Sequence, residues 1–220
     1  MIKPDEIIRS NRKTLSLSID FFGRVIVRAP RRYSEERIFA FIREKEDWIL
    51  RKKAQMQGAG MRLPPENLDG YTFLLLGKNC QIFLTDSRYV RYDAQNCRLY
   101  LPKTNAKTRL VKWIKENAKR ILTNVTQTKA QEMGVSFKSI TITSAKTRWG
   151  SCSGENAIRY SFRLLYAPKE VIEYVVVHEL SHVRHKNHSP CFWSEVATYC
   201  PTWRTHRAWL KQNAWLMAIL

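Results

Sequence analysis

The chain has 220 residues, of which 44% are hydrophobic, so it can bury one medium-sized core or two small ones. Lysine and arginine number 38 against 19 acidic residues, and the formal net charge of +19 favours contact with polyanions without fixing a fold. No stretch approaches the ~20 apolar residues of a membrane span, and the first residues lack the apolar segment of a secretory signal. Five cysteines without a Cys-x-x-Cys pair predict reduced thiols and favour a cytoplasmic protein.

The first half of the chain is predicted to be rich in strands. Apolar and polar residues alternate over residues 14–29 on both sides of a glycine, a pattern typical of a β-hairpin. Four more short runs of β-forming residues are bounded by turn residues. These strands are expected at residues 71–76, 81–85, 89–93 and 98–101.

One helix and one linker interrupt these strands. A capping serine and an apolar stripe predict a helix over residues 34–55. Residues 57–68, rich in glycine and proline, predict a loop or linker. Pro102 and the polar residues after it mark a boundary, so we expect a strand-rich N-terminal lobe over residues 1–103 and a second domain over residues 104–220.

The second domain mixes helices and strands. A long apolar stripe predicts a helix over residues 106–132, which Gly134 ends. Strands are expected at 139–143 and 157–165, and helices from Pro168, over 190–199 and over 203–220. The whole chain is therefore predicted to be of the α+β class.

The helix after Pro168 carries a metal-binding pattern. Its residues 175–182 have the sequence Val-Val-Val-His-Glu-Leu-Ser-His, so His178 and His182 lie on one helical face, roughly 6 Å apart along the axis. Imidazole nitrogen binds zinc well, and a catalytic zinc keeps three protein ligands and one open position. Glu179 projects near such an ion without binding it, where a general base for a zinc-bound water belongs.

A third ligand is required, and His188 is the favoured candidate. Five residues separate it from His182, enough for the helix to end and the chain to turn back. His185 and Glu195 are the alternatives. His185 lies too far along the helix to close the site easily, whereas a carboxylate such as Glu195 is an accepted third zinc ligand.

These motifs carry a family resemblance. The stretch Arg148-Trp149-Gly150-Ser151-Cys152-Ser153, the histidine-bearing helix and residues 188–193 resemble the YgjP-like metallopeptidases, which are related to the WLM and SprT-like zincins. The resemblance is specific from about Ser144 to Trp193. It implies a zincin-type fold with a twisted sheet, an active-site helix and a long backing helix. It also implies His178, His182 and His188 as ligands of Zn²⁺ and Glu179 as the base.

The preferred function is a zinc metallopeptidase. The strand at 157–165 is expected to be an open sheet edge that holds an extended peptide. Arg148 and Tyr160 are the predicted substrate-binding residues, and His185 and His206 are further candidates to stabilise the oxyanion.

Two other functions fit the sequence. Some members of the resembling family are described as UTP pyrophosphatases, and basic residues such as Lys146 and Arg159 suit a nucleoside triphosphate at the same metal. Alternatively, tryptophans between basic residues over 203–211 suit a nucleic-acid-associated module, although the same spacing is typical of a helix that packs its tryptophans inward. The partner is thus a peptide, a nucleotide or a nucleic acid, with no membrane contact expected.

Overall fold

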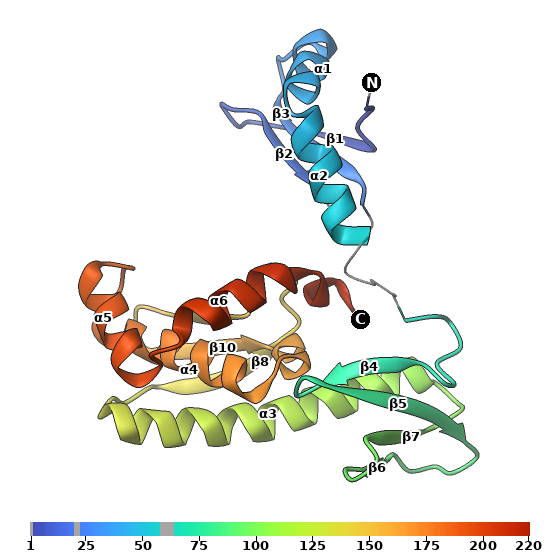
Figure 1. Cartoon of the computed structure of the whole chain (residues 1–220), viewed down its shortest axis with the longest axis vertical. Coiled ribbons are helices and arrows are strands. Elements are labelled where there is room, and N and C mark those ends of the chain that lie inside the picture. Colours follow the sequence, from blue (N-terminus) through green and yellow to red (C-terminus); the bar gives the residue numbers. More distant parts are fainter. Residues whose placement is uncertain (1, 20–22, 58–63) are drawn as a thin grey trace. The chain divides into compact units, whose positions relative to one another are not determined.

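The computed structural model describes residues 2–19, 23–57 and 64–220 (Figure 1). Contacts divide the chain into two compact units, Met1–Leu63 and Pro64–Leu220, and each has its own buried apolar cluster. This division differs from the predicted boundary near residue 103. The strands between residues 72 and 102 belong with the second unit, because apolar side chains from three of the four enter its core.

The first unit is a three-stranded sheet with two helices. Its strands β1 (Glu6–Ser10), β2 (Ser16–Ile19) and β3 (Val25–Pro30) lie in the order β1-β3-β2, with β3 central. The antiparallel β2–β3 pair confirms the predicted hairpin, whereas the parallel strand β1 was not predicted.

The predicted helix over 34–55 is two helices, α1 (Glu35–Glu44) and α2 (Glu46–Gln57). Ser34 caps α1 as expected, since its Oγ accepts a hydrogen bond from the Arg37 backbone N–H at 3.4 Å. Lys45 leaves helical geometry between the two helices, with φ −101° and ψ 10°. Residues 58–63 of the predicted linker over 57–68 lie outside the described residues.

The second unit opens with a four-stranded sheet in the order β4-β5-β7-β6. Its strands confirm the four predicted runs: β4 (Thr72–Leu75), β5 (Lys78–Thr85), β6 (Arg91–Asp93) and β7 (Arg98–Pro102). The backbone joins this sheet to the rest of the unit, because the N–H groups of Leu76 and Gly77 donate to the carbonyls of Leu165 and Tyr166.

Cys80 and Cys97 form a disulfide in this sheet, so the expectation that all thiols are reduced is wrong. The parallel register of β5 and β7 pairs Gln81 with Arg98, which brings the two preceding cysteines together with a Cα–Cα distance of 4.7 Å. Cys152, Cys191 and Cys200 are free. The cysteine count therefore no longer supports the cytoplasmic expectation.

A long helix and a small sheet follow. Helix α3 (Ala106–Met133) ends as predicted at Gly134, which adopts the left-handed conformation with φ 62°. Strands β8 (Ser139–Thr143), β9 (Gly150–Cys152) and β10 (Ala157–Ser161) lie in the order β8-β10-β9. Two predictions are wrong here. The strand expected over 157–165 ends at Ser161 and continues as the 3₁₀ helix η1 (Phe162–Tyr166), and β10 is central rather than an open edge.

Helix α4 (Lys169–Arg184) lies between α3 and α6 (Trp203–Gln212) and also contacts β9 (Figure 1). Helix α5 (Pro190–Tyr199) packs on α4, and the 3₁₀ helix η2 (Ala214–Ala218) follows α6. The architecture confirms the α+β class. Among the described helices, none combines the length and the apolar character that a membrane span requires.

Candidate metal centre

Helix α4 is placed by its apolar face and by both of its ends. The carbonyl of Pro168 accepts the N–H groups of Val171 and Ile172 at the start of the helix. Buried side chains along α4, including Val175, Val176 and Leu180, fix it within the core. The helix ends at Arg184, and His185 is extended with φ −119° and ψ 100°. This ending turns the chain back toward α4, as the spacing between His182 and His188 predicted.

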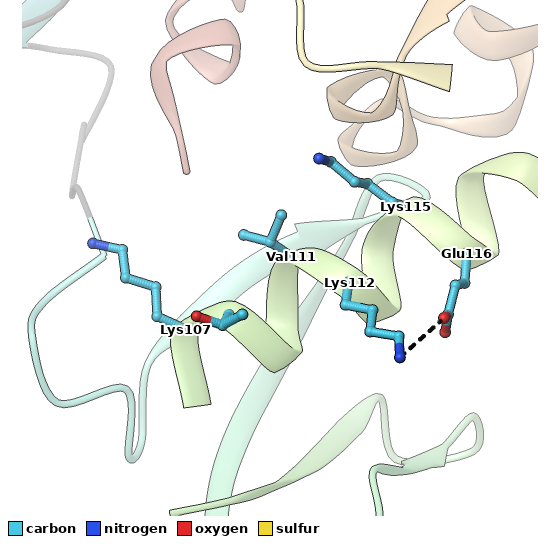
Figure 2. Close-up of a pocket in the computed structure, with 6 residues that line it drawn as sticks. Lys107, Val111, Lys112, Lys115 and Glu116 are labelled. Atoms are coloured by element: carbon cyan, nitrogen blue, oxygen red, sulfur yellow. Dashed lines mark ion pairs between the residues drawn. The ribbon is translucent and has the colours of Figure 1, made fainter. Parts of the chain in front are cut away.

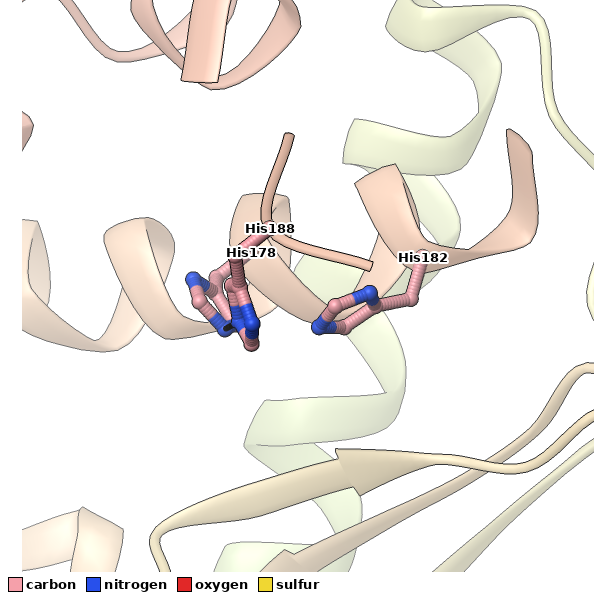
Figure 3. A group of neighbouring side chains, drawn as sticks. All are labelled: His178, His182 and His188. Atoms are coloured by element: carbon pink, nitrogen blue, oxygen red, sulfur yellow. Dashed lines mark hydrogen bonds between the residues drawn. The ribbon is translucent and has the colours of Figure 1, made fainter. Parts of the chain in front are cut away.

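The structure brings the three predicted ligands together. One ring nitrogen from each of His178, His182 and His188 lies within 4.8 Å of the others, and the Nε2 atoms of His178 and His188 are 3.1 Å apart. Figure 3 shows His178 and His182 projecting from α4 and His188 coming from the connection to α5, with the three rings converging. Among the described residues, these are the ones that could together hold a metal ion.

The donor set fits a divalent ion such as zinc. Tetrahedral zinc with Zn–N distances near 2.05 Å places its nitrogens about 3.3 Å apart, close to the 3.1 Å between His178 and His188. The Nδ1 atom of His182 lies 2.9 Å from the carbonyl oxygen of His185 and donates to it in the tautomer that leaves Nε2 free. Two Nε2 lone pairs that face each other repel unless a proton or a cation lies between them.

The pKa values of two of the histidines favour the neutral, metal-binding form. Burial, followed by the charges of His182, His188 and Arg207, lowers the pKa of His178 from 6.5 to about 3. The pKa of His188 is also lowered, again mainly by burial. Both imidazoles are therefore neutral at physiological pH, and neutral imidazole is the form that coordinates a metal.

Glu179, the residue after His178 on α4, carries a buried carboxyl group. Glu179 is 5% exposed, and burial raises the pKa of its carboxyl group from 4.5 to about 8. Gly150 of β9 makes room for it, because a β-carbon at that position would lie 2.6 Å from Glu179 Oε1 and 2.9 Å from its Cδ. The sequence predicted no role for Gly150, which entered only as part of the motif that carries the family resemblance. The sequence signal for such a role is a glycine within the motif that carries the resemblance. Its contact with the Glu179 side chain is evident only from the packing of β9 on α4.

The two alternative ligands, His185 and Glu195, pair with each other instead. His185 Nε2 lies 3.0 Å from Glu195 Oε2, and Arg184 Nη1 lies 2.5 Å from Glu195 Oε1. Arg184 Nη2 also donates to the carbonyls of Met133 and Gly134 at 2.8 and 3.0 Å. The three side chains tie the connection after α4 to α5 and to the end of α3.

The predicted substrate residues differ in their exposure to solvent. Tyr160 is completely buried, with its hydroxyl 3.2 Å from Thr126 Oγ1 in the core, so a substrate-contacting role does not agree with its burial. Arg148 is exposed just before β9, and its role stays a prediction. His206 on α6 lies beside Tyr174, with ring centroids 6.2 Å apart, and its Nε2 is 2.9 Å from Thr202 Oγ1.

A surface pocket of about 500 Å³ lies elsewhere in the second unit, along the first turns of α3 (Figure 2). Its lining residues all come from this one helix and include Lys107, Lys112 and Lys115. Lys112 and Glu116 form an ion pair at 3.9 Å between exposed side chains. The pocket is thus a solvated helical face with excess positive charge, and no histidine or cysteine lines it.

Three converging imidazoles and a buried glutamate next to one of them in the sequence, on an α+β scaffold, define a candidate metallohydrolase. The chain matches the model of the YgjP-like metallopeptidase domain over residues 13–213 and belongs to this family. Membership supports a metallopeptidase-type hydrolase that uses a divalent metal.

Two solved structures are similar to part of the chain. The metallopeptidase zymogen abylysin of Pyrococcus abyssi is 19% identical, with 42% of this chain and 93% of that chain covered and a TM-score of 0.39. The metallopeptidase zymogen jannalysin of Methanocaldococcus jannaschii is 18% identical, with 42% of this chain and 95% of that chain covered and a TM-score of 0.38. A search of the curated proteins gives no significant match.

Proposed function

We propose that the protein is a zinc-dependent metallopeptidase in which His178, His182 and His188 hold the metal and Glu179 is the general base. The observation that carries the proposal is the convergence of the three imidazole nitrogens within 4.8 Å at a helix that also carries the buried carboxyl group of Glu179, the residue after His178. Membership of the YgjP-like metallopeptidase family supports the same class.

The chemistry divides between the metal and the protein. Zinc, when bound, supplies Lewis-acid polarisation of a carbonyl and acidifies a water molecule. Glu179 receives the proton of the attacking water and returns it to the leaving amine. Burial raises the pKa of this carboxyl group to about 8 in the metal-free site, and a cation bound nearby would lower it toward the operating pH, where a general acid–base group works best.

Strand β9 is the proposed docking edge for the peptide. Among the described strands it pairs with β10 on one side, and it contacts the helix that carries Glu179. An extended peptide that pairs with the other side of β9 would pass close to Glu179, since Gly150 of this strand touches that side chain. This edge replaces β10, which the sequence predicted.

The decisive experiment compares Glu179→Gln with the matched variant Glu173→Gln, an exposed glutamate on the same helix. Glu179→Gln should retain one zinc per chain and lower the cleavage of unstructured peptides about a hundred- to ten-thousandfold, whereas Glu173→Gln should change little. Full activity of Glu179→Gln would exclude it as the base. Pyrophosphate release from UTP, measured on the same preparations, tests the alternative nucleotide substrate.

A further inference from the structure

Arg207 lies on the inward face of α6 and yet is exposed. The buried residues of this helix are Trp203 and Leu210, four positions before and three after Arg207. Residues at these spacings share one helical face, so Arg207 belongs to the face that packs on the rest of the unit rather than to the solvent face. The Arg207 side chain is nevertheless exposed, so it can be reached from solvent.

The Arg207 guanidinium lies beside the candidate metal centre. Its Cζ atom is 5.1 Å from the centroid of the Trp193 ring, and that ring stacks on His188 at 5.7 Å with an interplanar angle of 26°. Trp193 is also 5.8 Å from His178 and 4.3 Å from Trp203, on which it stacks. The positive charge of Arg207 contributes to lowering the pKa of both His178 and His188.

Within residues 2–19, 23–57 and 64–220, Arg207 forms no ion pair or hydrogen bond, and its contact is the face of Trp193. Two other arginines of this unit have polar partners: buried Arg163 donates to the carbonyls of Ser144 and Ile219, and Arg184, exposed like Arg207, pairs with Glu195. A guanidinium close to a divalent metal site costs electrostatic free energy, because like charges repel. An anion that contacts both would remove this cost.

We propose that Arg207 binds a carboxylate of the substrate and thereby makes the enzyme selective for peptides with a negative charge near the cleaved bond. The inference rests on the proposed peptidase function. A single guanidinium matches a single carboxylate through two parallel hydrogen bonds. Such a carboxylate comes either from the C-terminus of the peptide or from an aspartate or glutamate side chain.

Binding to the zinc-loaded Glu179→Gln protein tests the proposal without requiring turnover. Calorimetry should compare a peptide with a free C-terminus to its C-terminal amide, and a glutamate-containing peptide to its glutamine counterpart. We expect the charged member of at least one pair to bind about ten- to a hundredfold more tightly, the range for a charge-assisted hydrogen-bonded contact. The pair that differs identifies the source of the carboxylate.

The assignment of the preference to Arg207 is tested by introducing Arg207→Met into the Glu179→Gln protein. Methionine keeps an unbranched side chain against Trp193 but removes the charge. The charge preference should disappear, while zinc affinity should stay the same or increase because a repulsive charge is gone. The matched control is Arg204→Met, since Arg204 lies over Trp203 on the same helix at 4.6 Å. It should keep the preference.

Three results would overturn the proposal: equal binding within both peptide pairs, a preference that survives Arg207→Met, or a preference lost equally in Arg204→Met. The proposal would also be overturned if a UTP analogue bound in a manner that depends on Arg207 and was displaced by inorganic phosphate, while neither peptide pair showed a preference. Failure of the peptidase function is distinguishable, because binding is measured without turnover. A protein that cleaves no peptide but keeps the charge preference would contradict the peptidase function alone.

Discussion

At the residue scale, Gly150 is the position where one methyl group has the clearest predicted effect. A β-carbon there would overlap the carboxyl arm of Glu179 at 2.6 to 2.9 Å, so Gly150→Ala must displace the proposed base. We expect kcat to fall about tenfold to a hundredfold with zinc content unchanged, because small misplacements of a catalytic group have effects of this size.

The control for this variant is Gly154→Ala, whose β-carbon would meet no atom within 4 Å. It should keep wild-type kcat and KM. If both alanine variants lose activity equally, the effect comes from the backbone of strand β9 and the turn after it, and not from Glu179. A changed pH profile in Gly150→Ala alone would point to an altered environment of the Glu179 carboxyl group.

The buried titratable groups predict how the stability of the metal-free protein depends on pH. The pKa of Glu179 is raised from 4.5 to about 8, so the folded state holds an extra proton in this interval and loses stability as pH rises through it. The pKa of His178 is lowered from 6.5 to about 3, so the folded state loses stability as pH falls through that interval. The two effects oppose each other between pH 4.5 and 6.5.

We therefore expect chelator-treated protein to be most stable between pH 4.5 and 6.5 and to lose about 2 kcal/mol between pH 6.5 and 8, at 1.36 kcal/mol per pH unit. Urea unfolding at a series of pH values measures this. Glu179→Gln should remove the decline above pH 6.5, since the amide does not titrate. An identical decline in both proteins would contradict the assignment to Glu179.

At the scale of elements, the connection from α4 to α5 decides whether the third histidine is held in place. Glu195 of α5 pairs with Arg184 and His185, and the carbonyl of His185 lies 2.9 Å from His182 Nδ1. The Glu195 side chain is only 9% exposed, so its ion pairs are screened less than surface pairs. These contacts orient both His182 and the segment that carries His188.

Replacing Glu195 with glutamine should weaken zinc binding about tenfold to a hundredfold, the usual effect of losing a partner behind a metal ligand. Competition with a chromophoric chelator measures this affinity. Glu132→Gln is the matched control, because Glu132 pairs with Lys129 on α3 with a 46% exposed side chain. Such surface pairs contribute little, so zinc affinity should not change there. Unchanged affinity in Glu195→Gln would show that the connection is held by other contacts.

At the scale of the whole molecule, the two units have separate cores. The apolar cluster of the second unit includes residues of β4, β5, β7, α3, α4 and η1, whereas Val25, Val27 and Ile38 belong to the cluster of the first unit. A unit with its own core can fold alone. The candidate metal centre lies entirely within the second unit.

A fragment over Pro64–Leu220 should therefore fold and bind zinc with the affinity of the full chain. A single cooperative thermal transition and zinc titration provide the measurement. A fragment over residues 104–220, which begins at the boundary that the sequence predicted, should be unstable because it lacks the apolar side chains of β4 to β7. Stable folding of the shorter fragment would contradict the contact-based division.

The sequence by itself determined the features that depend on neighbouring residues. The histidine spacing on α4, the cap at Ser34, the helix end at Gly134 and the strands β4 to β7 were all predicted, because caps, periodicity and turn residues act over a few positions. The position of His188 close to the other two histidines was also predicted, since its separation from His182 only had to permit a turn.

Only the tertiary structure decided the contacts between distant segments. The register of β5 and β7 joined Cys80 to Cys97, and the packing of β9 on α4 placed Gly150 against Glu179. Burial removed Tyr160 from the candidate substrate residues, and the packing of α6 on α4 brought Arg207 over the ring of Trp193, which stacks on His188. Such contacts follow from strand register and helix packing, which no local pattern of residues specifies.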